Sequence, residues 1–405
     1  MQVTIVTAYF APEITPITHL YQDLAADLSR YGAEVTVVTG MANRGLNEEQ
    51  RAAYQTRTDE HTPEGFRILR VGNVRREGSG LLSRGLHFLS GTVSLYRVAK
   101  HVPTDVYLLG SMPPFLGLVG AQLSKRARTV YILQDIFPDS MLLMGKLSEH
   151  HPVIRLCRWM ERRSYRKNTR LITVSEDMKK TLLMRGVPQE RLDVIGNWAD
   201  TEAVRPVTRA DNPLFDELAL SREGFYAIYA GTLGILQCPD LLLDAAKLLK
   251  DQARITLLIL GGGALTAHVR TRMETEEIAN VKLFPLVSAD RVSEAYSLGD
   301  VALVPLVAGT TRVAMPSKTW SAMSAGRPVI ITAERDSAWA ELIAKAGCGY
   351  ICPPGDAETL ADALLACYYA RDTLPQMGAR ARTYVENECS RRQATSHYYE
   401  VLTKE

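Results

Sequence analysis

The sequence predicts an α/β protein with two doubly wound parallel sheets, one in each of two domains that face each other across a cleft. Apolar runs of strand length alternate with amphipathic segments of helix length through nearly the whole chain, a pattern typical of parallel sheets covered by helices. One polar, proline-containing interval, residues 202–223, interrupts the alternation and is predicted to be a linker. The length of 405 residues is ordinary for two domains that each bury a core.

The first domain is predicted at residues 1–201 and opens with a β-loop-α-β unit. Residues 2–7 have a buried-strand pattern, helix 20–31 has apolar residues at three- and four-residue spacing, and Gly32 ends it before strand 34–39. The first loop lacks the G-x-G-x-x-G pattern, which counts against an NAD enzyme. Further strands are expected at 66–74, 106–110, 129–133, 171–174 and 192–195, helices at 81–101, 152–168 and 175–185, and a polar loop with a short helix at 42–63.

Segment 152–168 is a strongly basic helix candidate. One face carries Arg155, Arg158, Arg162 and Arg166. Another carries Val153, Leu156 and Met160. Residues 1–200 hold 26 Lys and Arg against 20 Asp and Glu, a net charge of +6, and the remainder holds 21 against 25, a net charge of −4. Such a helix can lie on an anionic membrane, with the apolar segment 81–101 beside it. The alternative is an ordinary surface helix packed on the sheet.

The second domain is predicted at residues 224–385, followed by a C-terminal helix at 386–405 that packs back on the first domain. Its strands are expected at 226–229, 255–260, 281–284, 301–305, 329–331 and 349–352, and its helices at 239–250, 266–277, 291–298, 319–325, 338–346 and 356–369. Glycine-rich loops follow the first two of these strands, at 230–234 and 261–263.

The stretch 308–332 reads as loop, helix and strand, and we expect a ligand-binding site there. Pro316 can occupy a first helical turn, Ser317 can cap exposed backbone N–H groups, and Gly326 can end the helix in a left-handed conformation. A helix N-terminus with Lys318 beside it suits a diphosphate. The alternative is an ordinary helix start with a solvated lysine.

Composition excludes several classes of protein. The apolar content of 46% and the net charge of +2 are ordinary for a globular chain, and no interleaved basic and aromatic motif suggests nucleic-acid binding. The N-terminus reads as a strand and not as a signal peptide, and no run of about 18 apolar residues predicts a transmembrane helix. Scattered cysteines predict reduced, cytosolic thiols at Cys157, Cys238, Cys348, Cys352, Cys367 and Cys389.

Several motifs, in their order and spacing, resemble one family over essentially the whole chain. They are YFAPE, LQDIFPDSM, VSEDMKK and GNWAD in the first domain, and AGTLG, LGGG and PSKTWSAMSAGRPVI in the second. The sequence is similar to the retaining sugar-nucleotide glycosyltransferases of family 4, which have the GT-B fold. Within that family it most resembles fucosyl- and N-acetylfucosaminyl-type transferases of bacterial capsule, O-antigen and colanic acid synthesis.

The chain departs from the family at charged positions. The usual pair of glutamates falls on Val313 and Ser321, the usual Arg and Lys of the second domain fall on Thr232 and Gln237, and the usual His of the first falls on Gln134. The resemblance therefore implies that phosphate charge is met by Lys318, by backbone N–H groups at 231–234 and by Arg312 or Arg327.

The expected site residues follow from these motifs and from strand ends, where ligands of open parallel sheets bind. The donor-binding residues are expected to be Gly231, Thr232, Leu233, Gly234, Gln237, Pro285, Leu286, Val287, Arg312, Pro316, Ser317, Lys318 and Ser321, with Pro285 to Val287 assigned to the base by resemblance alone. The acceptor side is expected to hold Glu13, His19, Gln134 and Asp135. The catalytic residues are expected to be Asp135, Glu13 and Lys318; a helix cap is the alternative for Asp135, and a loop-ordering carboxylate for Glu13.

The expected reaction is retaining transfer of a hexose, of fucose type or N-acetylated, from a UDP- or GDP-sugar to a glycan or a polyprenyl-diphosphate-linked acceptor. No Asp-x-Asp pair suggests metal chelation, so we expect no metal and no cofactor. The protein is expected in the cytoplasm, in peripheral contact with the inner membrane leaflet. The alternatives are a GT-B sugar-nucleotide epimerase and a catalytically silent sugar-nucleotide-binding subunit.

Overall fold

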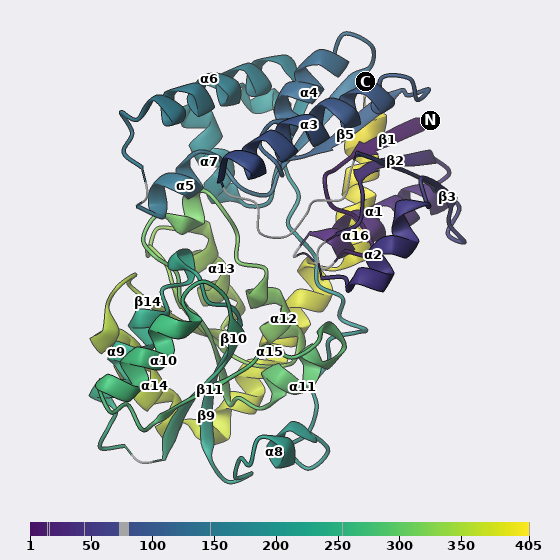
Figure 1. The fold of residues 1–405 in the computed structure, drawn as a ribbon. Coiled ribbons are helices and arrows are strands. Elements are labelled where there is room, and N and C mark those ends of the chain that lie inside the picture. Colours follow the sequence, from purple (N-terminus) through teal and green to yellow (C-terminus); the bar gives the residue numbers. More distant parts are fainter. Residues whose placement is uncertain are drawn as a thin grey trace. The chain divides into compact units, whose positions relative to one another are not determined.

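A computed structural model describes most of the chain as two compact units (Figure 1). The described residues are 1–13, 15, 17–43, 45–72, 81–145, 147–252 and 254–404, with the backbone alone for 81–87. Unit 1 comprises Met1–Asn197 and Arg391–Glu405, and unit 2 comprises Trp198–Ser390.

Unit 1 contains an eight-stranded sheet in the order β3-β4-β2-β1-β5-β6-β7-β8, in which β3 is antiparallel to β4 and the other neighbours are parallel. The strands are β1 (Gln2–Val6), β2 (Glu34–Gly40), β3 (Asp59–His61), β4 (Arg67–Val71), β5 (Val106–Gly110), β6 (Arg128–Leu133), β7 (Arg170–Thr173) and β8 (Leu192–Val194). The helices are α1 (Thr18–Arg30), α2 (Glu48–Gln55), α3 (Leu81–Ala99), α4 (Leu116–Leu123), α5 (Asp139–Leu143), α6 (Pro152–Lys167), α7 (Glu176–Met184), α16 (Arg391–Thr403) and the 3-10 turn η1 (Gln189–Arg191).

Helices of unit 1 form two groups. α16 returns from unit 2 and packs against α1, where the Arg391 guanidinium donates hydrogen bonds to Asp27 at 2.8 Å and to Asp23 at 2.6 Å. The other group is α3, α4 and α6, which lie side by side in Figure 1 and contact one another through α4. The chain runs from β1 outward to β2 and β4 and then crosses back to β5, and right-handed crossovers put α1 and α3 on opposite faces of the sheet.

Unit 2 contains a six-stranded parallel sheet in the order β11-β10-β9-β12-β13-β14. The strands are β9 (Phe225–Thr232), β10 (Ile255–Gly262), β11 (Val281–Phe284), β12 (Val301–Val304), β13 (Val329–Thr332) and β14 (Gly349–Cys352). The helices are α8 (Leu214–Glu217), α9 (Pro239–Leu248), α10 (Thr266–Thr275), α11 (Val292–Ser297), α12 (Lys318–Ser324), α13 (Ala338–Ala346), α14 (Ala357–Tyr369) and α15 (Leu374–Glu388), with 3-10 turns η2 (Ile235–Gln237), η3 (Ala289–Arg291), η4 (Thr310–Arg312) and η5 (Arg371–Thr373).

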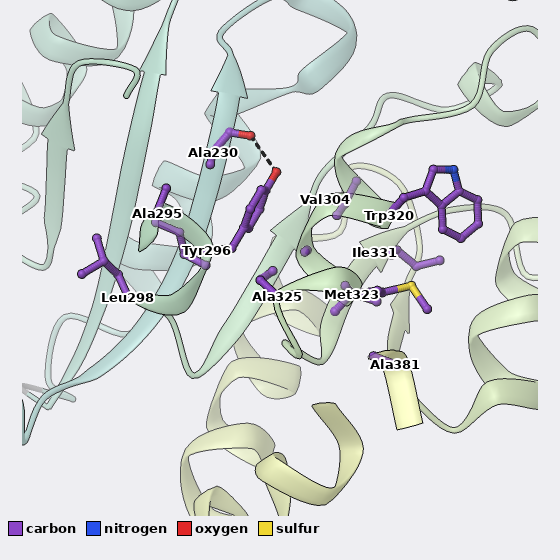
Figure 2. Packing of buried hydrophobic residues seen from close by; sticks show 14 of the residues in the cluster. Ala230, Ala295, Tyr296, Leu298, Val304, Trp320, Met323, Ala325, Ile331 and Ala381 are labelled. Carbon is purple, nitrogen blue, oxygen red and sulfur yellow. Dashed lines mark hydrogen bonds between the residues drawn. The ribbon is translucent and has the colours of Figure 1, made fainter. Parts of the chain in front are cut away.

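Two apolar clusters cover the two faces of the second sheet. Leu242 of α9 and Leu364 of α14 belong to one cluster, and Tyr296 of α11, Trp320 of α12 and Ala381 of α15 belong to the other. Figure 2 shows the second cluster, where the Tyr296 hydroxyl donates a hydrogen bond to the Ala230 carbonyl at 3.2 Å. This bond links α11 to the carboxyl-terminal part of β9.

The order of strands and helices agrees with the sequence prediction, and so do several helix ends. Ser175 accepts a hydrogen bond from the Met178 N–H and Asp356 from the Thr359 N–H, as N-caps do. Gly326 ends its helix with a φ of 68°. The short elements β3, α5 and α8 were not predicted, because three to five residues are too few for a periodic pattern.

The linker predicted at 202–223 was wrong, because this interval is packed as part of unit 2. Phe215 is fully buried, and the Arg209 guanidinium donates hydrogen bonds to the Gly224 carbonyl at 3.0 Å and to Asp300 at 2.6 Å. The two joints between the units lie after Asn197 and after Ser390. In the predicted strand 66–74, residues 73 and 74 lie outside the described residues.

Within the part of the chain that the structure describes, no helix combines the length and the apolar character that crossing a bilayer requires. All six cysteines are free thiols.

We predict that Gly349→Ala destabilises unit 2. A Cβ atom at this position would lie 1.9 Å from the Val329 carbonyl oxygen, in the ladder between β13 and β14, so the two strands would have to separate. Overpacking of this kind costs about 1–3 kcal/mol, so the melting temperature of unit 2 should fall by several degrees. The control is Gly91→Ala in α3, where a Cβ meets no atom within 4 Å and stability should not fall. Equal melting curves for the two variants would contradict the packing described.

Candidate functional site

The centre of the second sheet is a topological switch point. From β9 the chain fills the sheet toward β10 and β11 on one side, and then returns to fill it toward β12, β13 and β14 on the other. The loops that follow β9 and β12 therefore diverge at the carboxyl edge, which is where open α/β sheets bind ligands. The N–H of Val307 donates to the Leu236 carbonyl at 3.1 Å and joins the two loops there.

Lys318 lies at this switch point without a carboxylate partner. Its ammonium group donates a hydrogen bond to the Tyr229 hydroxyl at 2.7 Å and lies 4.1 Å from the centre of the Tyr229 ring. Among the described residues, no carboxylate forms an ion pair with Lys318. Burial lowers the pKa of the Lys318 ammonium to about 7. A partly buried cation with no counter-ion is a place where an anion would bind favourably.

Tyr229 uses both capacities of its hydroxyl group. The hydroxyl donates to the Thr232 carbonyl at 2.5 Å and accepts from Lys318, and burial raises the Tyr229 pKa well above its usual range. It therefore stays protonated and neutral, and it orients the ammonium group without cancelling its charge.

Glycines in the β9 loop leave room for these groups. Gly231 has a φ of 145°, and a Cβ atom there would lie 3.2 Å from the Lys318 Nζ. A Cβ at Gly234 would lie 2.6 Å from the side-chain oxygen of Gln237, which folds back over this residue. The backbone conformation at Gly231 therefore favours glycine, whereas a side chain at Gly234 would only displace the end of the Gln237 side chain.

Glu334 fixes the loop between β12 and α12. Its carboxylate accepts hydrogen bonds from the Gly309 N–H at 2.5 Å and from the Thr311 hydroxyl at 3.1 Å. Thr332, at the end of β13, exchanges hydrogen bonds with the backbone of Leu306 at 2.6 and 2.9 Å. Side chains at the end of β13 and just after it therefore fix the loop that leads to Lys318. Arg312 lies exposed on the same loop.

The remaining donor-side residues are not all placed as predicted. Leu233 is fully buried, and its N–H donates to the Gly262 carbonyl at 2.9 Å, so this amide cannot bind a phosphate. Ser317 makes no side-chain cap, contrary to prediction. Arg327 precedes β13 and donates to the Gly299 and Ala325 carbonyls, so it lies at the opposite edge of the sheet from Lys318.

The other predicted donor-side residues lie on neighbouring elements of unit 2. Thr232 is exposed at the end of β9, while Pro316 and Ser321 lie before and within α12. Residues 285–287 follow β11, two strands from β9, and Leu286 is 54% exposed. An exposed leucine at this edge offers an apolar surface.

Unit 1 has a cavity of about 260 Å³ at the carboxyl edge of its own sheet. Residues that follow β1, β2, β4 and β5 line it, together with α3. Glu13 is buried in its wall and accepts a hydrogen bond from the Asn43 N–H at 3.0 Å. Its carboxylate therefore orders the loop after β2, as the alternative interpretation held, and it also borders the cavity.

The other acceptor-side residues lie elsewhere. Asp135 borders a smaller cavity with Tyr131 and Tyr165, and burial raises the pKa of its carboxyl group to about 6. The side chain of Gln134 is buried and accepts a hydrogen bond from Asn197 at 2.8 Å. His19 is exposed in the first turn of α1. Glu13 and Asp135 therefore line different cavities in unit 1.

Sequence reasoning missed Tyr229 and Glu334. Tyr229 stands in a run of apolar strand residues, so nothing in the pattern marks its hydroxyl as a partner of Lys318. Glu334 follows β13 by two residues, and a carboxylate directly after a buried parallel strand is a signal that could have found it.

Two family models match this chain. One, the glycosyl transferase 4-like domain, matches residues 18–198, and the other, glycosyl transferases group 1, matches residues 224–369. The chain is 28% identical over 292 residues to WbjE of Pseudomonas aeruginosa, named as a glycosyltransferase, with 71% of this chain and 72% of that protein covered. It is 26% identical over 401 residues to WcaI of Escherichia coli (strain K12), named for colanic acid biosynthesis glycosyl transfer, with 95% and 96% covered.

Solved structures share the fold. Sucrose-phosphate synthase from Thermosynechococcus elongatus has a TM-score of 0.78 at 16% identity, covering 99% of this chain and 98% of that one. Anabaena Alr3699/HepE, in complex with UDP and glucose, has a TM-score of 0.74 at 17% identity and covers 100% of both chains.

We predict that the Lys318 amine gains acylation reactivity with a midpoint near pH 7, because burial has lowered its pKa to about this value. Exposed lysines gain reactivity up to about pH 10. Peptide mass spectrometry after brief acylation at a series of pH values gives both profiles in one sample. A Lys318 profile that runs parallel to those of the surface lysines would mean that the amine is solvated in the free protein.

Proposed function

Because this chain is a GT-B glycosyltransferase, made of a 4-like domain and a group 1 domain, we propose that it transfers a hexose from a nucleoside-diphosphate donor bound in unit 2. The observation that carries the proposal is Lys318, a cation at the switch point of the second sheet that has no carboxylate partner among the described residues. The acceptor is a glycan of a bacterial surface polysaccharide, or a precursor of one carried on a polyprenyl diphosphate.

In this reaction the bond between the anomeric carbon and the diphosphate oxygen breaks, and negative charge grows on the leaving diphosphate. A positive group held in a partly buried site stabilises that charge more strongly than it would in water. We assign this role to Lys318, with the backbone of Gly231 beside it. The exposed Leu286 and its neighbours after β11 would receive the base.

Relatives support the choice of donor and pathway. The structure of Alr3699/HepE, with the same fold, contains UDP and glucose, so UDP is a reasonable nucleotide to test first. WcaI is named for colanic acid biosynthesis, which supports a surface polysaccharide as the product. We further propose that the sugar is of fucose type or N-acetylated, that the reaction retains configuration and that it needs no metal. Donor assays with and without EDTA test the independence from metals.

We propose that unit 1 binds the acceptor. Asp135, with a pKa of about 6, is mostly ionised at neutral pH and is the better candidate to accept a proton, or to stabilise positive charge on the sugar. Glu13 borders the larger cavity and would orient the acceptor there. His19 and Gln134 would contribute through their positions at the carboxyl edge of the same sheet.

One observation favours a second candidate, a subunit that binds sugar nucleotides without turnover. The positions of the family's glutamate pair hold Val313, which is buried, and Ser321, and Thr232 and Gln237 replace the usual basic pair. Such a subunit would bind the donor and give no product. An epimerase would convert the donor without an acceptor, so product analysis with and without acceptor separates the three.

We predict that Lys318→Ala abolishes thermal stabilisation by the correct nucleotide. A ligand at about 100 times its Kd should stabilise the native state by roughly 2.7 kcal/mol. The panel is UDP, GDP, UDP-N-acetylglucosamine and GDP-fucose, and the matched control is Lys250→Ala, an exposed lysine after α9. If no nucleotide stabilises the wild type, the donor site is refuted; if Lys318→Ala responds as the wild type does, the role of Lys318 is refuted.

We also predict that donor affinity falls as pH rises above 7. The free protein holds Lys318 with a pKa of about 7, and a bound diphosphate raises that pKa, so binding above pH 7 takes up a proton. The association constant should therefore fall by at most about tenfold per pH unit. UDP-glucose is the suitable probe, since its diphosphate diester does not titrate in this range. Calorimetry on Lys318→Arg, which stays charged, should show a flat profile; a slope equal to the wild type's would assign the proton to another group.

A further inference from the structure

The outward face of α6 combines exposed apolar residues with unneutralised cations. Val153, Leu156 and Trp159 are 45%, 57% and 51% exposed. The exposed cations beside them are Arg155, Arg162, Arg163, Arg166 and Lys167. At about 100° per residue, Leu156 and Trp159 lie about 60° apart on the helix and Arg163 falls between them. We name these eight residues the α6 outer face.

The opposite side of α6 anchors the helix to unit 1. Ile154 and Tyr165 are buried there, and α6 packs along α4, as Figure 1 shows. The apolar stripe of the outer face therefore is not the side by which the helix joins its own core.

The membrane-facing set predicted from sequence was wrong in two members. Arg158 is turned toward α5, where it pairs with Asp139 and with Glu161. Met160 is 6% exposed and belongs to the core, while Trp159 takes its place on the outer face. Glu161 is the one carboxylate among the 16 residues of α6, and it is buried and paired with Arg158 and Arg185. The outer face itself therefore carries only positive charge.

A groove extends the outer face on its basic side. Arg162 and Arg166 border a cavity of about 460 Å³ that reaches the turn at Gly186 and Arg191. Glu161 also lines this cavity, with its charge paired to Arg158 and Arg185. Arg191 is committed to backbone carbonyls, including that of Tyr165 at 2.7 Å. Neither Arg162 nor Arg166 has a hydrogen-bond or ion-pair partner among the described residues, so both charges are available to a phosphate.

We propose that the α6 outer face docks unit 1 on an anionic phospholipid bilayer, with α6 lying in the plane of the interface. Tryptophan and leucine enter the interfacial region, arginines flank them at the height of the headgroups, and the groove receives a headgroup phosphate. The Arg163 guanidinium already lies 6.0 Å from the centre of the Trp159 ring, an arrangement suited to the boundary between apolar and charged layers. The inference rests on the proposed function in one respect, namely that a lipid-linked acceptor would be met at this surface.

The test is sedimentation of the full chain with vesicles of phosphatidylcholine alone or mixed with phosphatidylglycerol, without nucleotide. We expect binding to the anionic vesicles only, weakened by salt. Each cation near an anionic surface changes partitioning by about five-fold, so Arg155, Arg162, Arg163 and Arg166 changed together to Gln should lower it by at least about 100-fold. The matched control changes four exposed cations of unit 2 to Gln: Lys250, Arg254, Arg270 and Lys282.

Trp159 provides a second readout at the site itself. The other three tryptophans, Trp198, Trp320 and Trp339, are at most 5% exposed. A blue shift of the emission on adding anionic vesicles therefore reports on Trp159, and Trp159→Phe should bind vesicles without that shift.

Two outcomes would overturn the docking surface: no binding of the wild type to anionic vesicles, or equal losses in the α6 and control variants. Thermal stabilisation by UDP, measured on the same samples, tests the proposed donor site independently of the docking surface. Vesicle binding without any nucleotide binding would reject the donor site and leave the surface standing. Nucleotide binding without vesicle binding would reject the docking surface and leave the donor site standing.

Discussion

The donor site proposed in unit 2 depends on a cation that no carboxylate among the described residues neutralises. Lys318 could be stabilised by a carboxylate, yet its partner is the neutral hydroxyl of Tyr229. Two neighbouring residues leave the Lys318 charge without a counter-ion. Gly231 places no side chain beside the ammonium group, and the Glu334 carboxylate accepts a hydrogen bond from the loop backbone instead of pairing with Lys318. An unpaired partly buried charge is unfavourable in the empty protein, and we expect the same arrangement to favour the binding of a diphosphate.

Many of the arginines that the structure describes have a structural role, which sets the cations proposed to bind ligands apart from them. Arg272 pairs with Asp240, Asp244 and Glu276, and Arg209 with Asp300. Such pairs fix the relative positions of elements and offer nothing to a ligand. Lys318 in unit 2 and the α6 outer face in unit 1 lack acidic partners among the described residues. The proposed donor site and the proposed lipid surface thus lie in different units, so we expect that mutation can disable either one without the other.

The sequence predicted the features that periodicity and local chemistry encode. The alternation of strands and helices, the caps at Ser175 and Asp356 and the left-handed Gly326 all depend on neighbours within a few residues. Hydrogen-bond and ion-pair partners that lie far apart in the chain could not be predicted from these local patterns. Residues 202–223 have the composition of a linker, and only Asp300, far along the chain, makes Arg209 part of unit 2. Helical spacing likewise predicted that Arg158 shares a helix face with the other arginines. The direction of its side chain, however, depends on its ion pair with Asp139, which the spacing does not reveal.

A lysine at the centre of the proposed donor site has a physical advantage over an arginine. An arginine stays protonated under all ordinary conditions, so an empty site would always hold a charge without a partner. A lysine with a pKa of about 7 can release its proton when the site is empty and regain it when an anion enters. As the glycosidic bond breaks, the leaving diphosphate becomes more negative and holds that proton more firmly. The attraction between Lys318 and the diphosphate would therefore be strongest at the moment of bond cleavage, which is the condition for stabilising a transition state more than the bound donor.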